Sequence, residues 1–316
     1  MRAITESALL AALTVLLMFA GNFLPVIGFF LVLIWPIPIM LVVIRHGLKY
    51  GIMAIAVTIA LGATFLGILQ AVLTGVTVVG FIGVALGVGL RLDWDAPTLI
   101  GAASCAVALS FLIIVLLAGP LMGINIVEQI QTNVGEGFEQ ALEIYVQRGL
   151  LGPEDAEQMQ EQMQLTVELV NMMFPAIFLL SSAVYAVWTF LVTRLVLPRL
   201  GYPVPALPEF SRWQAPVWLA FIYVASLLSE MFFARQPGVY LLDLVGNVFF
   251  LTNLVYLVCG TALLYFFLKH YLRFRWLAGL ACFLVATHHF GALLLPLAAI
   301  LDSGMDFRER FESKYG

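Results

Sequence analysis

The sequence predicts an all-α fold, a polytopic transmembrane helix bundle of eight or nine spans with an acidic helical hairpin outside the membrane. Hydrophobic residues make up 62% of the 316 residues and charged residues only 11%, with a mean hydropathy of +1.03. Soluble domains carry charge on about a quarter of their residues. Apolar runs of about 20 residues, the length that crosses a hydrocarbon core, follow one another along the chain. One polar stretch, at 121–167, interrupts them.

The apolar runs divide a single membrane domain, 1–316, into five spans at 1–121, an insertion at 122–167, the remaining spans at 168–300 and a polar tail at 301–316. The first run follows Met1 and Arg2 directly, but further runs come at once, so we expect it to stay in the protein as a helix. The expected spans are 7–24, 27–44, 51–69, 71–90, 98–121, 168–193, 214–233, 240–268 and 275–300.

The distribution of Lys and Arg predicts an N-terminus in the cytoplasm, because short cytoplasmic loops are enriched in these residues. Ten of the fifteen basic residues then lie inside, whereas Arg148 and Arg235 lie outside. The other three lie in the tail, which nine spans would place outside. Either the last run is a re-entrant or broken helix whose tail returns to the cytoplasm, or the tail lies outside because its weak charge bias is overridden. The inner basic residues are Arg2, Arg45, Lys49, Arg91, Arg194, Arg199, Arg212, Lys269, Arg273 and Arg275.

The polar stretch at 121–167 carries eight acidic side chains against the single base Arg148, a formal charge of −7, and we expect it outside the membrane. Gly149 and Gly152 should end its first helix, and Pro153 suits the first turn of a second helix that runs on into the sixth span. The segment is either a hairpin packed on the bundle or a lid over an outward-opening cavity. Apolar residues recur on one face of the first helix at Val127, Ile130, Val134, Phe138, Leu142 and Tyr145.

Small residues at a spacing of four occur in two of the expected spans. Ala8 and Ala12 form one such pair and Gly83 and Gly87 another. Helices in lipid associate largely through close approach at Gly, Ala, Ser and Thr, because no hydrophobic force drives them together. Each pair either packs helices inside the bundle or forms a surface on which a partner docks.

Polar residues inside spans are candidates for function, because a charge at a helix centre costs about 2.5 to 3.5 kcal/mol on insertion scales. Glu230, Arg235 and Asp243 lie near the outer ends of two spans. They form either a structural ion pair at the membrane interface or a site for a polar solute. His288 is either a satisfied core histidine or a proton-linked or substrate-contacting group. The amides join neighbouring helices or line a polar cavity. They belong to Gln70, Asn171, Asn247 and Asn253.

The N-terminal half contains Ala8-xxx-Ala12 within ALLAAL, Pro36-Ile-Pro38, Arg45-His-Gly47 and Gly51. With these features, roughly residues 1–195 resemble the substrate-binding S components of energy-coupling-factor vitamin transporters. This resemblance implies that the small-residue face of the first helix docks a transmembrane coupling subunit. S components have six helices and little outside the membrane, so the acidic insertion and the later spans are departures.

Three groups of segments in the later half carry a second resemblance. They are Phe210-Ser-Arg-Trp213 with Pro216-Val-Trp218, Asn253-Leu-Val-Tyr256 with Gly260-Thr-Ala262, and Leu301-Asp302 with Asp306-Phe307-Arg308. These segments resemble the YybS-like family of bacterial membrane proteins, which carries a domain of unknown function. The resemblance implies the fold and a location in the bacterial cytoplasmic (inner) membrane, and it brings no established catalytic residues.

Signatures of common enzymes are absent from the sequence. No lysine lies in a Walker A phosphate loop, and neither HExxH nor GxSxG occurs. The three cysteines, Cys105, Cys259 and Cys282, lie in expected spans without CxxC spacing, so we interpret them as packing thiols. We therefore predict no enzyme activity, no metal and no cofactor, and any drive from ATP must come from a partner.

Three functional hypotheses remain. The first is a substrate-binding or transport-type component without its own ATPase, which binds an unknown small molecule and a transmembrane coupling subunit. The alternative is an envelope scaffold or assembly protein that uses the acidic hairpin to bind an envelope partner. The third is a lipid-handling or enzymatic role for His288, Glu230 and Asp243. All three place the chain in a lipid bilayer and none involves nucleic acid. The candidate substrate-binding residues are Gln70, Glu230, Asp243, Asn247, Asn253 and His288; the candidate docking residues are Ala8, Ala12, Gly83 and Gly87.

Overall fold

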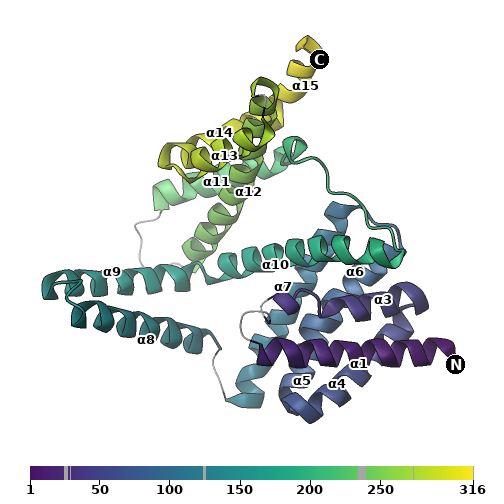
Figure 1. Cartoon of the computed structure of the whole chain (residues 1–316). Coiled ribbons are helices and arrows are strands. Elements are labelled where there is room, and N and C mark those ends of the chain that lie inside the picture. Colours follow the sequence, from purple (N-terminus) through teal and green to yellow (C-terminus); the bar gives the residue numbers. More distant parts are fainter. Residues whose placement is uncertain (25–27, 29, 124–125, 234–239, 273, 316) are drawn as a thin grey trace. The chain divides into compact units, whose positions relative to one another are not determined.

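Helices form all the regular secondary structure in the part of the chain that the structure describes. This computed structural model describes residues 1–24, 28, 30–123, 126–233, 240–272 and 274–315, and within those ranges it has no strand (Figure 1). The all-α prediction is confirmed.

The helices divide into two compact units. Unit 1 comprises Met1–Leu169 with Phe178–Leu207, and unit 2 comprises Val170–Ile177 with Pro208–Gly316. Unit 1 contains α1 (Arg2–Phe23), α3 (Pro36–His46), α4 (Leu48–Leu66), α5 (Ile68–Thr74), the π-helix η1 (Gly75–Phe81), α6 (Ile82–Arg91), α7 (Ala96–Met122), α8 (Ile126–Gln147), most of α9 (Pro153–Met172), most of α10 (Phe174–Val196) and the 3₁₀ turn η2 (Leu197–Leu200).

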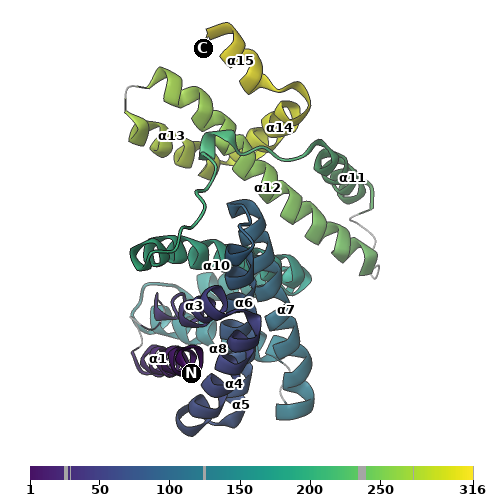
Figure 2. The same cartoon turned by 90° about the vertical axis from the view of Figure 1, so that its right-hand side faces the viewer.

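Unit 2 is built around one long helix, α12 (Tyr240–Tyr271), against which three further helices pack (Figure 2). These are α11 (Val217–Phe233), α13 (Arg275–Thr287) and α14 (His289–Met305). The short helix α15 (Phe307–Tyr315) ends the chain, and the 3₁₀ turn η3 (Phe210–Arg212) precedes α11.

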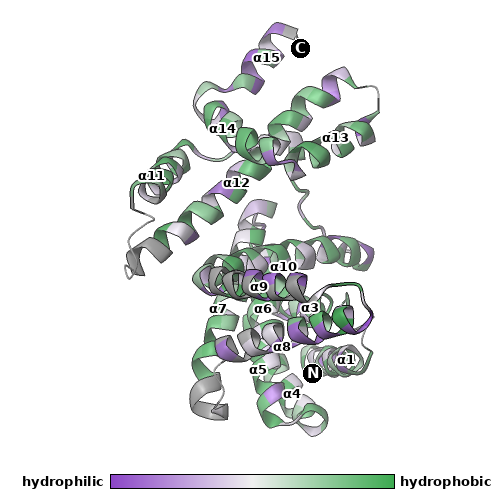
Figure 3. Cartoon of the chain, turned by 90° about the vertical axis from the view of Figure 1, so that its left-hand side faces the viewer, coloured by the Kyte–Doolittle hydropathy of each residue, from purple (hydrophilic) through white to green (hydrophobic). Residues whose placement is uncertain are grey.

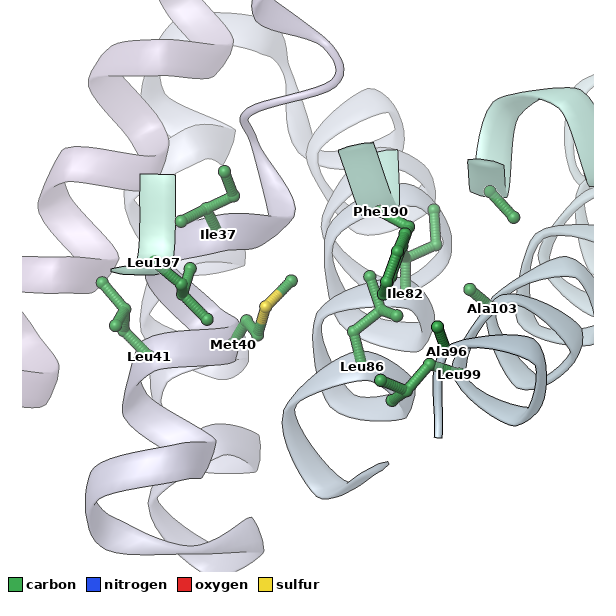
Figure 4. Packing of buried hydrophobic residues seen from close by; sticks show 11 residues of the cluster. Ile37, Met40, Leu41, Ile82, Leu86, Ala96, Leu99, Ala103, Phe190 and Leu197 are labelled. Atoms are coloured by element: carbon green, nitrogen blue, oxygen red, sulfur yellow. The ribbon is translucent and has the colours of Figure 1, made fainter. Parts of the chain in front are cut away.

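The core of unit 1 lies where α3, α6, α7 and α10 meet. Its buried side chains come from all four helices and from η2 (Figure 4). Glycines let α3 and α6 approach closely: a Cβ at Gly83 would lie 3.0 Å from the Pro36 carbonyl oxygen, and one at Gly87 would lie 2.8 Å from Val43 Cβ. The core residues are Ile37, Met40, Leu41, Ile82, Leu86, Ala96, Leu99, Ala103, Ala186, Phe190 and Leu197.

Helix α1 buries one face in unit 1 and leaves the opposite face uncovered. Ser7, Ala11 and Met18 are buried, whereas Ala8 is exposed and Ala12 is half-buried. The small-residue pair of α1 therefore lies at the edge of the uncovered face.

An ion-pair cluster ties α1 to α3 at one end of unit 1. The carboxylate of Glu6 pairs with the guanidinium of Arg45 and accepts from His46 Nε2 at 3.0 Å. Arg45 Nε also donates to the Tyr202 hydroxyl at 2.7 Å. Gly47 directly follows α3 with a φ of +91°, which glycine adopts without a steric penalty, and so allows the chain to turn into α4.

The acidic segment forms two helices, α8 and α9, separated by Gly149 at a φ of +67°. Gly149 ends α8 and Pro153 begins α9, as the sequence predicts. The second helix does not run on unbroken into the sixth span, because the chain turns at Met173 before α10 begins. Pro175 lacks a backbone N–H and is tolerated in the first turn of a helix, so a new start at Phe174 suits it.

By length and composition, six of the described helices could cross a membrane, or seven if α13 and α14 together form one span. The expected eight or nine spans exceed this number because α3 and α11 are shorter apolar helices and α13 and α14 are separated by a sharp bend. Figure 3 shows hydrophobic residues over most of α7 and α10, and hydrophilic residues on α8, α9 and α15.

The run at 275–300 is a broken helix. Helices α13 and α14 meet at His288 with a bend of 104°. Arg275, at the start of α13, and Phe311, in α15, line the same pocket as Lys269 near the end of α12. The chain therefore leaves one end of α12 with α13 and is back at that end with α15, which favours the re-entrant alternative for the last run and for the tail.

Candidate functional site

A pocket lined by both polar and aromatic side chains lies in unit 2, at the C-terminal end of α12. Its volume is about 690 Å³, within the range of about 300 to 1,000 Å³ typical of small-molecule sites. Residues from η3, α12, α13 and α15 surround it, so the loop before α11 and the tail of the chain contribute together. They are Glu209, Phe210, Ser211, Tyr265, Phe266, Lys269, His270, Arg275, Phe311 and Glu312.

Lys269 links the pocket wall to the loop before α11. Its ammonium donates to the Ser211 hydroxyl at 2.8 Å, lies 3.5 Å from the Glu209 carboxylate and lies 5.4 Å from the centre of the Phe266 ring. The positive charge of Lys269 lowers the pKa of the exposed Glu209 carboxyl. Glu209 therefore stays ionised at neutral pH, and the pocket presents both signs of charge.

Aromatic rings form the opposite wall. The Phe311 ring of α15 meets Phe267 and His270 of α12 edge-to-face, with ring centres 5.3 and 5.1 Å apart. Such pairs contribute about 0.5 to 1.5 kcal/mol beyond their buried area. They hold α15 against the end of α12 and leave an apolar surface beside the charged groups.

A buried guanidinium holds the loop, α12 and the tail together beneath the pocket. Arg308, 9% exposed, donates from its two terminal nitrogens to the carbonyls of Ser211 at 2.7 Å and Trp213 at 2.9 Å. Its Nε lies 3.1 Å from an oxygen of Asp302, which is 1% exposed, and one terminal nitrogen also lies 3.4 Å from the Cys259 carbonyl of α12. The planar fork of arginine suits such a set of partners better than a lysine would.

Asp302 and the neighbouring residues extend this network. The second oxygen of Asp302 accepts from the Phe307 N–H at 3.1 Å, which caps the start of α15. The Gln214 amide donates to the Asp302 carbonyl at 2.9 Å and to the Asp306 carboxylate at 3.1 Å. Asp306 has a φ of +48°, a conformation that Asp tolerates better than most residues, and this turn redirects the chain from α14 into α15.

The segments singled out in the later half of the sequence come together in unit 2. The 210–213 segment supplies the carbonyls that Arg308 binds. Gly260 lies so close to Leu295 of α14 that any side chain would meet its backbone. The Asn253 amide oxygen accepts from the Tyr223 hydroxyl at 3.3 Å, which joins α12 to α11.

The profile of a family described as "Predicted membrane protein (DUF2232)" matches residues 12–303. The chain belongs to the DUF2232 family. The "Uncharacterized protein YybS" of Bacillus subtilis (strain 168) is 23% identical over 315 residues, which cover 98% of each chain. The resemblance to YybS-like proteins is thereby confirmed. No solved structure matches the chain significantly.

In this DUF2232 protein, the predicted substrate-binding residues are scattered and do not form one site. Gln70 donates to Asn22 at 3.3 Å, which joins α5 to α1 in unit 1. Asn247 bridges the turn between α9 and α10, since its amide donates to the Met172 carbonyl and accepts from the Ala176 N–H, both at 2.8 Å.

The other predicted residues lie elsewhere in unit 2. Asn253 pairs with Tyr223, and His288 is exposed at the break between α13 and α14. Glu230 and Asp243 belong to α11 and α12, but their side chains and the whole of Arg235 lie outside the described residues. The candidate docking residues divide into two groups: Ala8 and Ala12 at the uncovered face of α1, and Gly83 and Gly87 buried against α3.

Sequence reasoning missed the pocket and its support. In the sequence, Lys269 and Arg275 served only to predict topology, and Arg308 only for topology and as part of the YybS-like resemblance. The sequence held one signal for the buried network. Asp302 and Arg308 both belong to the segments 301–302 and 306–308 that carry the YybS-like resemblance. An Asp and an Arg six residues apart around a helix end could have been considered as an ion pair.

Replacing Arg308 tests the buried network. We expect Arg308→Ala to lower the free energy of unfolding by about 3 to 5 kcal/mol, because it leaves Asp302 buried without its partner. Arg310→Ala removes an exposed arginine from the same helix and should change the free energy of unfolding by no more than about 0.5 kcal/mol. Thermal unfolding in detergent measures both, and equal stability of the two variants would contradict the assigned role of Arg308.

Proposed function

We propose that this protein is a solute-binding, transport-type component of the bacterial inner membrane that has no ATPase of its own. The pocket at the end of α12 is the observation that carries the proposal. A purely structural bundle does not need a pocket of about 690 Å³ at a helix end, held open by side chains from four separate elements.

The lining chemistry favours a small charged solute. Lys269 and Arg275 offer positive charge, Glu209 and Glu312 offer negative charge, and Phe311 offers an apolar wall. A solute that bears both signs of charge, such as a zwitterion, would find a partner for each group. The basic residues near the pocket favour a position on the cytoplasmic side under the positive-inside rule.

The first helix supports a partner-dependent role. Unit 1 packs Ser7, Ala11 and Met18 of α1 inward and leaves Ala8 at an open face. In lipid, a second helix approaches closely where small residues are available. This arrangement agrees with the docking role that the resemblance to S components of energy-coupling-factor transporters implies for Ala8 and Ala12.

Ligand-induced stabilisation tests the pocket. We expect fractionated cytoplasmic metabolites to raise the melting temperature of the purified protein, because a ligand that binds only the folded state stabilises it. Arg275→Ala should abolish the shift, since Arg275 makes no hydrogen bond or ion pair with any described residue and is free to bind the solute. Arg310→Ala, which removes an exposed arginine beyond the pocket lining, should keep the shift. No shift with any fraction, or an equal shift in Arg275→Ala, would count against this site.

Co-purification tests the partner surface. We expect the protein, purified in mild detergent from its native membrane, to bring down an ATP-hydrolysing complex. Ala8→Trp should prevent recovery of ATPase activity, because the larger side chain blocks close approach of a second helix. Leu13→Trp is the control, since Leu13 is exposed on a different side of α1.

Two outcomes would contradict this surface. One is recovery of the complex in full by the Ala8→Trp variant. The other is recovery that survives Ala8→Trp but is lost on deletion of residues 125–165, which would favour a scaffold acting through α8 and α9. The exposed Ile144 and Tyr145 of α8 are the apolar groups available for such a contact.

A further inference from the structure

The break between α13 and α14 places backbone and polar side chains deep in the membrane. α13 has 13 residues, and at a rise of about 1.5 Å per residue it reaches about 20 Å from the pocket end of α12. The hydrocarbon core of a bilayer is about 30 Å thick. Arg275 lines the pocket and Cys282 Sγ lies 3.8 Å from the Thr261 carbonyl, so α13 runs back along the span formed by α12, and its tip at His288 lies inside the hydrocarbon region.

The tip carries polar groups without sufficient protein partners. His288 Nδ1 accepts from the Phe290 N–H at 3.3 Å, which caps α14, but the imidazole itself is exposed. The imidazole of His289 is also exposed and makes no hydrogen bond or ion pair to any described residue. Pro296 lacks an N–H, so the Ala292 carbonyl loses its usual donor four residues further on.

His289 lies beyond the part of α14 that protein covers. Seven residues make almost two full turns, so His289 shares a face of the helix with the buried Pro296. Leu293, four residues after His289 and near the same face, is already 55% exposed. The face that packs against protein at Pro296 is therefore uncovered among the described residues where it reaches His289.

Hydrocarbon cannot satisfy these groups. Non-helical backbone at membrane depth is tolerated only where protein or water covers it, and ionisable side chains there face a bundle interior or a water-filled cavity. Broken helices are also the elements that build solute and ion sites in transporters.

We propose that the tip of the α13–α14 pair borders a water-filled path that enters the membrane, with His288, His289 and the Ala292 carbonyl at its wall. Water supplies the hydrogen bonds that His289 and Ala292 lack, and the acceptor atoms at the wall suit cationic, water-soluble species. This inference goes beyond solute binding at the α12 pocket, because water access to the tip does not depend on any ligand there.

Thiol labelling in sealed membrane vesicles tests the path. The background is the full-length chain with Cys105, Cys259 and Cys282 replaced by Ala, and His289→Cys supplies the only thiol. The probe is a membrane-impermeant, positively charged methanethiosulfonate, added separately to vesicles of each orientation. Leu294→Cys is the lipid-facing control and Ser313→Cys, in the exposed part of α15, is the aqueous control.

We expect the thiol from His289→Cys to react from one side at a rate at least tenfold above that of Leu294→Cys. Protection equal to that of Leu294→Cys, with full reaction after denaturation, would overturn the inference and show that protein or lipid covers the tip. If the cysteine-free chain does not fold, the same substitutions are made in the native chain. The native protein then gives the background labelling, and the inference requires an increase above it for His289→Cys but not for Leu294→Cys.

Discussion

The buried pair of Arg308 and Asp302 is the interaction on which unit 2 depends. One guanidinium reaches the carbonyls of Ser211 and Trp213 before α11, the Cys259 carbonyl of α12 and the carboxylate at the end of α14. Burying such a pair costs several kcal/mol of desolvation per ion, so only a full set of partners makes it tolerable. Removing either partner alone leaves the other charge buried and uncompensated. A substitution of either Arg308 or Asp302 should therefore destabilise unit 2.

The network has a topological consequence. Arg308 lies in the first turn of α15 and joins it to the loop before α11 and to Cys259 of α12, while Phe311 packs α15 on the C-terminal end of α12 beside the polar pocket. The tail is therefore fixed at the same end of unit 2 as the turn between α12 and α13. A chain held in this way cannot use α13 and α14 as one straight span. The bend of 104° at His288 allows the chain to meet that constraint.

The pocket and the broken helix pair also have a physical relation. The tail that Arg308 fixes contributes Phe311 and Glu312 to the pocket, and the first residue of α13 contributes Arg275. The pocket therefore exists only because the chain returns to this end. The helix α13 therefore links the two features, since its first residue lines the pocket and its last residue precedes the break at His288.

Much of the fold was predictable from the sequence, because long apolar runs and the acidic stretch at 121–167 are dictated by solubility in lipid and water. The ends of α8 and the start of α9 followed from Gly149 and Pro153. The break at Met173 was missed, because apolar residues continue on both sides of it. At 275–300 a re-entrant helix was one of two alternatives, but hydropathy cannot distinguish a span from two shorter helices that return.

The candidate site was less predictable, because its residues are brought together by tertiary structure. Glu209, Lys269, Arg275 and Phe311 are separated by up to a hundred residues, and none forms a recognisable motif. Intramembrane polarity led instead to Asn247 and Asn253, which the structure places in hydrogen bonds between neighbouring helices. Polar residues in spans are informative about function only when their partners are known.

The most direct test of this account is the side of the membrane on which the tail lies relative to the end of α12. A reporter that is active on only one side can be fused after Tyr271 in one chain and after Gly316 in another. The re-entrant pair held by Arg308 predicts that both reporters lie on the same side. Reporters on opposite sides would mean that α13 and α14 cross the membrane, and would contradict the account.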